Sequence, residues 1–132
     1  MYLDSAYVAK FYVNEPNMVA VRKLIRGAAN VRPSSWALLE VTSVFHPHVR
    51  EGALSVAQGR ELMDVFRGHV ESDAFPRRAV TSIRGLPKIV PLRAGDAIHL
   101  ATALDVGETE IWTNDRHLLA AAAQLGIAGR SV

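Results

Sequence analysis

The 132-residue sequence predicts an α/β fold in which helices cover both faces of a mostly parallel sheet. Short apolar segments with strand character alternate with longer segments of helical spacing along the chain. The composition, with 49% hydrophobic and 21% charged residues, is typical of a globular protein. No repeat, low-complexity tract or linker interrupts the sequence, so we expect one domain over residues 1–132.

The N-terminal part of the chain indicates one strand followed by two helices. Residues 1–5 (MYLDS) are expected to form a short buried strand that passes directly into a helix over residues 6–12. Apolar residues recur at helical spacing in residues 18–28, and Gly27 suits the C-terminus of that helix.

The middle of the chain is predicted to add two strands and two helices. Residues 30–34 (NVRPS) have the character of a second strand, and the following helix is expected over residues 34–45. A longer helix is predicted over residues 55–70, with a serine at its start as the N-cap. A third strand is expected late in residues 74–83, because Pro76 disfavours a strand at their beginning.

The C-terminal part repeats the alternation of helix and strand. We expect a helix over residues 95–107, a strand over 110–113 and a helix over 115–126 that Gly126 closes. Residues 127–132 are expected to add an edge strand. In such sheets, sites form in the crevice outside the carboxyl ends of the strands.

Three acidic residues stand where this rule expects functional side chains. Asp4 directly follows the first strand, Asp115 follows the fourth strand, and Asp96 stands at a helix start. Each also has a structural explanation, because an aspartate before a helix can accept hydrogen bonds from the backbone N–H groups of the first turn. Asp96 could in addition form a local ion pair with Arg93. Taken singly, these acids do not distinguish a cap from a site.

Glu40 is harder to explain as a structural residue. Its neighbours three and four positions away in the predicted helix are Trp36, Ala37, Ser43 and Val44. None of these is a cation, and a carboxylate on a largely apolar helix face costs stability unless a group outside the helix compensates it. A tertiary arginine is one such group, and a shared functional site is the other explanation.

Together, the acids predict a metal site. The four candidates are Asp4, Glu40, Asp96 and Asp115. In one crevice they would repel each other, because two unit charges about 4 Å apart interact by roughly 4 kcal/mol at an effective dielectric near 20. Protonation could relieve this repulsion, but a divalent cation relieves it with less loss of charge. Oxygen ligands and the absence of cysteine favour a hard ion, Mg²⁺ or Mn²⁺.

Four segments in this order and at these spacings resemble one known family. They are MYLDSAYVAKFY, ALLEVTS, LRAGDAIHLATAL and IWTNDRHLLAAAAQLG, and the most specific pieces are DAIHLATA and TNDRHL. The sequence resembles the PIN-domain family over nearly its whole length, and within it the VapC-type ribonuclease toxins of bacterial toxin–antitoxin pairs. The resemblance implies a three-layer α/β/α sandwich and an endoribonuclease that depends on Mg²⁺ or Mn²⁺.

The resemblance also assigns roles to individual residues. Asp4 and Asp96 would be the principal metal ligands, with Asp115 and Glu40 completing the site directly or through water. Supporting hydroxyl groups would come from Ser5 and Thr113. The family further implies an RNA substrate, a homodimer and a cognate antitoxin that covers the active site. Whether one metal ion or two would bind is left open.

Basic residues near the acids have two explanations. Arg93 and Arg116 lie three positions and one position from a candidate acid, and would either contact RNA phosphates or neutralise the carboxylates. His99, one helical turn from Asp96, invites an acid–base role, although a packed histidine with one hydrogen-bonded ring nitrogen is the favoured interpretation. The net charge of +2 and the pI near 9.3 favour nucleic-acid contact only mildly.

Other features narrow the classes that the chain can belong to. The absence of cysteine excludes disulfides and thiolate chemistry and fits a reducing cytosol, so we expect a cytoplasmic protein. The N-terminus lacks the basic region of a signal peptide, and no apolar stretch approaches the roughly 18 residues of a membrane span. Two alternatives to a nuclease stay open: an enzyme that forms an aspartyl-phosphate on Asp4, and a catalytically silent protein that binds RNA or an antitoxin.

The sequence departs from the family pattern at two places. Pro47 falls where the family continues a helix, and a proline in a helix interior costs about 3 kcal/mol or forces a kink. Residues 79–95 are short and interrupted by prolines where relatives place a full helix. Neither departure touches the four candidate acids, so we expect both to affect local packing and the surface that meets an antitoxin or partner subunit.

Overall fold

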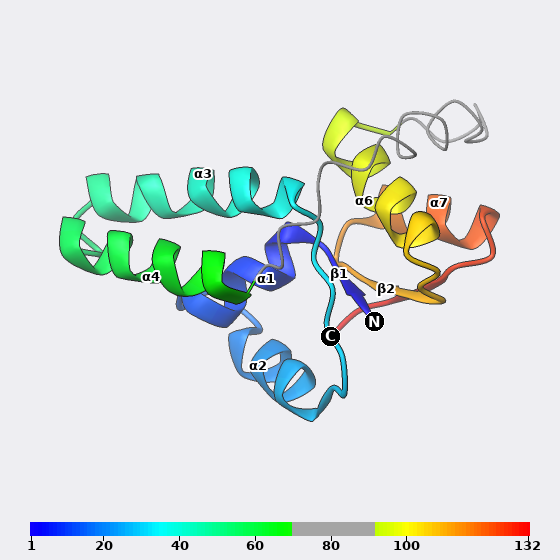
Figure 1. Cartoon of the computed structure of the whole chain (residues 1–132), viewed down its shortest axis with the longest axis horizontal. Coiled ribbons are helices and arrows are strands. Elements are labelled where there is room, and N and C mark those ends of the chain that lie inside the picture. The colour runs from blue at the N-terminus through cyan, green and yellow to red at the C-terminus, as the bar shows by residue number, and fades with distance from the viewer. Residues whose placement is uncertain (70–91) are drawn as a thin grey trace.

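The computed structural model describes residues 1–69 and 92–132 of the chain, and the elements below belong to those residues. In chain order they are β1 (Tyr2–Leu3), α1 (Ser5–Tyr12), α2 (Met18–Gly27), α3 (Trp36–Arg50), α4 (Val56–His69), α6 (Ala94–Asp105), β2 (Glu110–Trp112), α7 (Arg116–Gln124) and β3 (Ala128–Arg130). In Figure 1, α1 to α4 lie on one side of β1 and β2, and α6 and α7 lie on the other.

The described strands form one parallel sheet in the order β1-β2-β3. The edge strand predicted at residues 127–132 is confirmed by β3, which pairs with β2. The strand predicted at residues 30–34 was wrong, because only Arg32 forms an isolated parallel bridge, to Tyr2 on the free side of β1. Pro33 follows directly and has no N–H to extend that pairing. The strand predicted within 74–83 lies outside the described residues.

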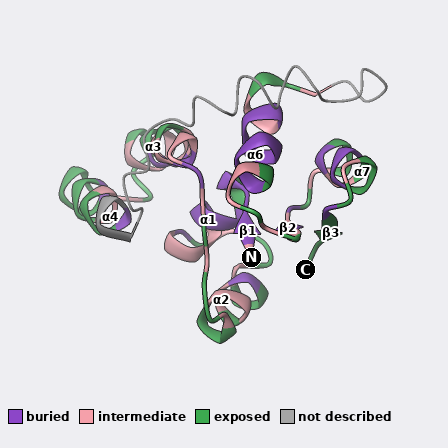
Figure 2. Ribbon diagram, turned by 45° about the vertical axis from the view of Figure 1, so that its right-hand side comes forward, coloured by how far each residue is buried: buried purple, intermediate pink, exposed green. Residues whose placement is uncertain are grey.

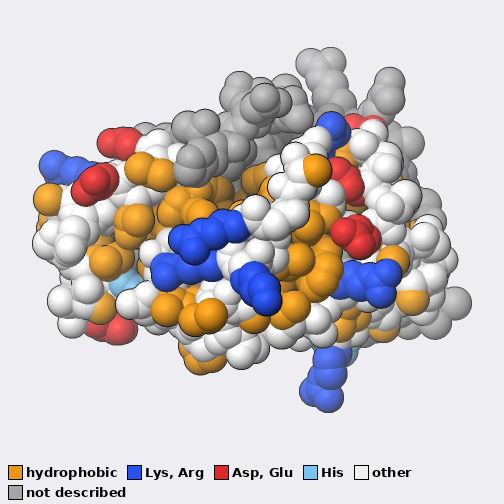
Figure 3. All heavy atoms as spheres, turned by 90° about the horizontal axis from the view of Figure 1, so that it is seen from below, with side chains coloured by type: hydrophobic (Ala, Val, Ile, Leu, Met, Phe, Trp, Pro, Cys, Tyr) orange, Lys and Arg blue, Asp and Glu red, His pale blue; other side chains and the backbone are white. Residues whose placement is uncertain are grey.

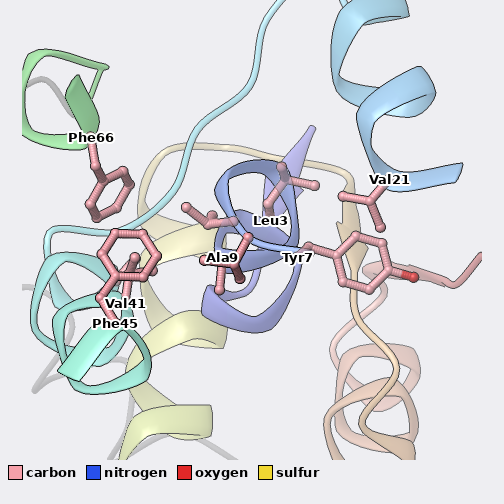
Figure 4. Close-up of a cluster of buried hydrophobic side chains, with 10 residues drawn as sticks. Leu3, Tyr7, Ala9, Val21, Val41, Phe45 and Phe66 are labelled. Atoms are coloured by element: carbon pink, nitrogen blue, oxygen red, sulfur yellow. The ribbon is translucent and has the colours of Figure 1, made fainter. Parts of the chain in front are cut away.

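The two residues of β1 point to opposite faces of the sheet, because side chains alternate along a strand. Leu3 packs in a core with side chains of α1 to α4, including Tyr7, Val21 and Phe45, as Figure 4 shows. Tyr2 packs in a second core with side chains of α6, β2 and α7. Helices therefore cover both faces of the sheet, and the predicted α/β/α sandwich is confirmed.

Helix α6 is the most deeply buried helix segment beside the sheet. Its residues Ala97 to Ala103 are all buried, and Figure 2 shows this burial along most of its length. The helix carries a buried histidine, His99, whose side chain faces the sheet near Tyr2. Because α6 is enclosed, polar groups on its inner face must find partners within the protein.

Helix α3 continues through Pro47 and ends at Arg50, five residues beyond the predicted end of this helix. The proline lies in the last turns of the helix, and the backbone N–H of Glu51 still donates to the Pro47 carbonyl oxygen at 2.8 Å. Pro47 therefore does not end the helix, and its effect is limited to the one backbone N–H that a proline lacks. The second departure, at residues 79–95, lies mostly outside the described part of the chain.

Seen from below in Figure 3, the surface carries a group of Lys and Arg side chains among apolar ones. Helix α2 is the lowest element in Figure 1, and its Lys23 and Arg26 are exposed.

Among the helices of the described residues, none has the length and apolar character that a membrane crossing requires.

Candidate acidic active site

Asp4 is a buried carboxylate at the carboxyl end of β1 and the N-cap of α1. Its Oδ1 accepts from the backbone N–H of Tyr7 at 2.9 Å, and the Thr113 hydroxyl donates to its Oδ2. Only 6% of the residue is exposed, and burial raises the pKa of Asp4 although the bonds from Thr113 and Tyr7 oppose the rise. In the described part of the chain these partners are neutral and no ion pair reaches Asp4.

Asp115 is the N-cap of α7, and the hydroxyl group of Thr113 connects it to Asp4. Its Oδ1 accepts from the backbone N–H groups of His117 at 2.8 Å and Leu118 at 3.3 Å. The backbone N–H of Asp115 donates to Thr113 Oγ1 at 3.0 Å, while that hydroxyl donates to Asp4. Thr113 thus contacts the carboxyl group of Asp4 and the backbone of Asp115.

Asp96 lies in the first turn of α6 and does not cap it. The helix begins at Ala94, so the N-cap position falls on Arg93, and the capping explanation for Asp96 was wrong. Arg93 donates from Nε to Asp96 Oδ2 at 3.3 Å and from Nη2 to Asp115 Oδ2 at 2.6 Å. The arginine side chain is 78% exposed, and the two acids raise the pKa of Arg93.

The charge on Asp115 is stabilised by its surroundings. Partial burial acts against ionisation, but the backbone N–H groups of His117 and Leu118 together with Arg93 outweigh it and lower the pKa of Asp115. The local ion pair foreseen between Arg93 and Asp96 is present and extends to a second acid. Of the two explanations offered for Arg93, the geometry in the described residues matches neutralisation of the carboxylates.

Glu40 extends from α3 toward α1 and α6. Its Oε2 accepts from the Ser5 hydroxyl at 2.5 Å and lies 2.8 Å from Nε2 of His99. Burial acts against ionisation of Glu40, but the hydrogen bonds from His99 and Ser5 outweigh it and lower the pKa to about 2. The compensating group outside the helix is thus a histidine with a serine, whereas the sequence suggested an arginine.

Gly95 allows α6 to approach α3 at this point. A Cβ atom added to Gly95 would stand 2.7 Å from Glu40 Oε1 and 3.1 Å from Trp36 Nε1. The indole N–H of Trp36 is buried and has no hydrogen-bond partner among residues 1–69 and 92–132, although the nearby indole contributes to lowering the pKa of Glu40. We take the indole as an electrostatic neighbour of the carboxylate, because its geometry does not make a hydrogen bond.

All four predicted acids therefore fall in one chain of contacts at the carboxyl edge of the sheet. Thr113 joins Asp4 to Asp115, Arg93 joins Asp115 to Asp96, and Ser5, next to Asp4, holds Glu40. Arg116, at the start of α7, is exposed and makes no contact with these acids in the described residues. Within residues 1–69 and 92–132, no group of three or more Asp, Glu or His side chains is placed closely enough together to hold a metal ion.

The sequence predicted a smaller role for His99 than the structure shows, and it gave no indication of Tyr2 or Gly95. His99 uses both ring nitrogens, with Tyr2 and with Glu40, and not the single one expected of a packed histidine. Tyr2 and Gly95 were not singled out. The spacing of Asp96 and His99 on one face of α6 was a usable signal, whereas the Tyr2 and Gly95 contacts depend on tertiary distances.

This fold and this arrangement of acids define a class of protein. The model of the PIN domain family matches residues 1–124. The chain therefore belongs to the PIN-domain family.

Within the family, the chain is of the VapC type. It is 31% identical over 130 residues to "Ribonuclease VapC46" of Mycobacterium tuberculosis, an alignment that covers 97% of this chain and 94% of that protein. A solved chain of VapBC2 from Rickettsia felis, bound to a DNA fragment from its promoter, shares the fold with a TM-score of 0.68. That match covers 99% of this chain and 98% of the other at 12% identity.

Proposed function

We propose that the protein is an endoribonuclease that hydrolyses RNA phosphodiester bonds at this acidic edge, with Mg²⁺ or Mn²⁺ as cofactor. The observation that carries the proposal is a network of polar contacts at the carboxyl edge of the sheet that includes all four acids. Thr113 contacts Asp4 and the backbone of Asp115, Arg93 bridges Asp115 and Asp96, and Ser5, next to Asp4, donates to Glu40. The relative named a ribonuclease, similar over nearly the full length of both chains, supports RNA as the substrate.

The donor set fits a hard divalent ion. All four candidate side chains offer carboxylate oxygens, and the chain contains no cysteine. The guanidinium of Arg93 already lies between Asp96 and Asp115, so this part of the edge attracts positive charge. A complete cage of three ligands is not required, because Mg²⁺ usually takes one or two carboxylates and keeps several waters. We assign Asp4 and Asp96 as principal ligands, with Asp115 beside them.

Different residues would have different roles in the proposed hydrolysis. A bound divalent ion would supply polarisation of a phosphate oxygen and a lowered pKa for a water molecule. Glu40 is ionised at neutral pH and would orient an attacking water by accepting a hydrogen bond from it. Ser5 and Thr113 hold the carboxylates of Glu40 and Asp4 in place.

Arginines at two helix starts complete the proposed site. Arg93 would exchange its carboxylate partners for an RNA phosphate when a cation binds the acids, because a guanidinium binds either group bidentately. Arg116 is exposed at the start of α7 and offers a second guanidinium. Single-stranded or looped RNA is the expected substrate, because the narrow major groove of A-form RNA does not admit side chains.

Partners form part of the same proposal. We expect a homodimer in the cytoplasm and a cognate antitoxin that covers the acidic edge. The solved VapBC2 of Rickettsia felis, bound to a DNA fragment from their promoter, supports an antitoxin partner for a chain of this type. The mass of the purified chain in solution tests the homodimer, and co-purification with a co-expressed antitoxin tests that partner, both separately from catalysis.

An RNA-cleavage assay tests the proposed activity. Asp4→Asn and Asp96→Asn are expected to lower Mg²⁺-dependent cleavage by about 10²- to 10³-fold, the range seen when a single electrostatic group of an active site is removed. EDTA should abolish wild-type cleavage. Glu61→Gln, at an exposed position of α4, is the matched control and should cleave like wild type.

Folding of the variants is checked by circular dichroism, since both Asp side chains also contact the protein. Asn at position 4 can still accept the Tyr7 N–H, so we expect Asp4→Asn to stay folded. Full cleavage by either folded variant would overturn the assignment. RNA binding by wild type without any cleavage would instead favour the catalytically silent alternative.

A further inference from the structure

A chain of polar contacts runs behind Glu40 into the core between the sheet and α6. The Tyr2 hydroxyl lies 2.7 Å from His99 Nδ1, and His99 Nε2 lies 2.8 Å from Glu40 Oε2. Ser5 Oγ lies 2.5 Å from the same carboxylate oxygen and 3.2 Å from His99 Nε2. The contacts link the adjacent elements β1 and α1 to α3 and α6, which are distant from them in the sequence.

Burial fixes the partners in this chain. Tyr2 is 0% exposed and His99 is 3% exposed, so water does not replace either contact. The Glu40 side chain is 34% exposed, whereas that of His99 is 4% exposed. The carboxylate therefore stands at the boundary between the core and the acidic edge, with its support on the buried side.

The contacts also fix where the proton of His99 lies. Because the Ser5 hydroxyl donates to Oε2, this oxygen acts as an acceptor, and a bare Nε2 at 2.8 Å would place two acceptors against each other. Nε2 must therefore carry a proton and donate it to Glu40. The Tyr2 hydroxyl can then donate to Nδ1, which orients the ring from its other side.

The two oxygens of Glu40 consequently have different surroundings. Oε2 accepts from Ser5 and from His99, which holds the carboxylate against rotation. Oε1 points to the start of α6, where a Cβ on Gly95 would lie only 2.7 Å away. That start is the turn that carries Asp96, so the held carboxylate lies against the residue next to Asp96.

We propose that His99 is a positioning residue for catalysis: its Nε2–H holds the Glu40 carboxylate toward the acidic edge, and Tyr2 holds the ring. The inference rests on the proposed function, in which Glu40 orients the attacking water. Loss of a group that orients an active-site ligand commonly lowers activity by about 10- to 100-fold.

Two amide substitutions separate the two ring nitrogens. Asn places its amide group near the position of Nδ1, so His99→Asn keeps a partner for Tyr2 and loses the donor to Glu40. Gln places its amide near Nε2, so His99→Gln keeps a donor to Glu40 and loses the contact with Tyr2. Both variants carry an uncharged amide side chain. Each loses one of the two contacts of His99, the one with Glu40 or the one with Tyr2, so each serves as the control for the other.

Steady-state cleavage of a single-stranded RNA with Mg²⁺ gives the decisive comparison. His99→Asn is expected to lower kcat by about 10- to 100-fold with little change in KM, while His99→Gln stays within about threefold of wild type. Melting temperatures of the two variants are expected to be similar, so a difference in kcat reports position and not folding. Equal losses in both variants, or wild-type kcat in a folded His99→Asn, would overturn the inference.

A second readout does not require activity. ¹⁵N NMR of the imidazole in the wild-type protein should show a protonated Nε2, and the Nε2–H signal should shift in Glu40→Gln. An Nε2 without a proton would overturn the inference regardless of cleavage. A wild-type chain that cleaves no RNA would contradict the proposed function instead, and the NMR result would then still decide whether His99 holds Glu40.

Discussion

Asp4 combines two roles that the sequence presented as alternatives. One carboxylate oxygen caps α1 through the Tyr7 N–H, as the structural explanation required. The other oxygen accepts from Thr113, which also contacts the backbone of Asp115. Capping therefore accounts for one oxygen of the carboxyl group and for its orientation. It does not account for the burial of this acid without an ion pair in the described residues, which raises its pKa.

Glu40 predicts a specific pH dependence of stability. Its pKa in the folded protein, about 2, lies below the ordinary value of 4.5. A lowered pKa means that the ionised group stabilises the fold above pH 4.5, and that this contribution is lost as pH falls toward 2. Because the side chain is 34% exposed, solvent screening reduces the contribution to on the order of 1 kcal/mol.

Urea unfolding of Glu40→Gln in EDTA measures this contribution. The free energy of unfolding should lie below that of wild type at pH 7, and the difference should narrow as pH falls toward 3. Glu61→Gln, on the exposed side of α4, should stay within about 0.5 kcal/mol of wild type at pH 7. A difference between Glu40→Gln and wild type that grows at acid pH would contradict the assigned direction.

Arg93 predicts competition between a guanidinium and a divalent ion. The arginine bridges Asp96 and Asp115, so an ion that binds these acids must displace it. Arg93→Gln is expected to tighten Mn²⁺ binding about two- to fivefold, as suits the loss of an exposed ion pair. Isothermal titration without RNA measures the affinity. Arg116→Gln is the control, because Arg116 follows Asp115 but makes none of these contacts, and it should bind Mn²⁺ with wild-type affinity. Weaker Mn²⁺ binding by Arg93→Gln would contradict the proposed competition.

At the scale of elements, the first turns of α6 gather much of the site. Arg93, Asp96 and His99 follow each other at intervals of three, so they lie along one side of the helix. Asp96 and Arg93 contact groups at the acidic edge, while His99 reaches into the core. The apolar segment behind them fixes the helix against the sheet and thereby fixes the direction of the acid.

Gly95 tests whether the approach of α6 to α3 matters. An alanine there would place Cβ 2.7 Å from Glu40 Oε1, and the carboxylate cannot easily yield because Ser5 and His99 hold it. We expect Gly95→Ala to lower kcat about tenfold or more with only a small change in melting temperature, because alanine favours the helix. Gly27→Ala, at the end of α2 with nothing within 4 Å of the added Cβ, is the control. Wild-type kcat in Gly95→Ala would show that the close approach has no role.

The helices were predictable because their signals are local. Ser55 caps α4 by accepting the Gln58 N–H at 3.1 Å while Gln58 Oε1 accepts the Ser55 N–H at 2.8 Å, and Gly126 follows α7 at φ 73°. The strand at 30–34 was wrong because its apolar pattern could not reveal that only one bridge forms. The extension of α3 past Pro47 depends on packing that no local pattern contains.

At the scale of the whole molecule, the parallel sheet explains why acids from distant segments meet. The carboxyl ends of parallel strands share one edge, so the positions of Asp4 and Asp115 after strands were sufficient to predict their proximity. The bridge made by Arg93 and the support of Glu40 by His99 were not predictable, because each depends on distances between helices. Sequence patterns indicated the site, whereas its polar connections required the structure.

The most direct measurement is anomalous diffraction from crystals soaked in Mn²⁺. The proposed function predicts a peak at the acidic edge with carboxylate oxygens of Asp4 and Asp96 at about the 2.0–2.2 Å expected for a small divalent ion, and with Arg93 moved away from Asp96. Crystals of Asp96→Asn should lose the peak. An occupied Mn²⁺ site elsewhere, with none between Asp4 and Asp96, would contradict the central claim that these acids share a metal ion.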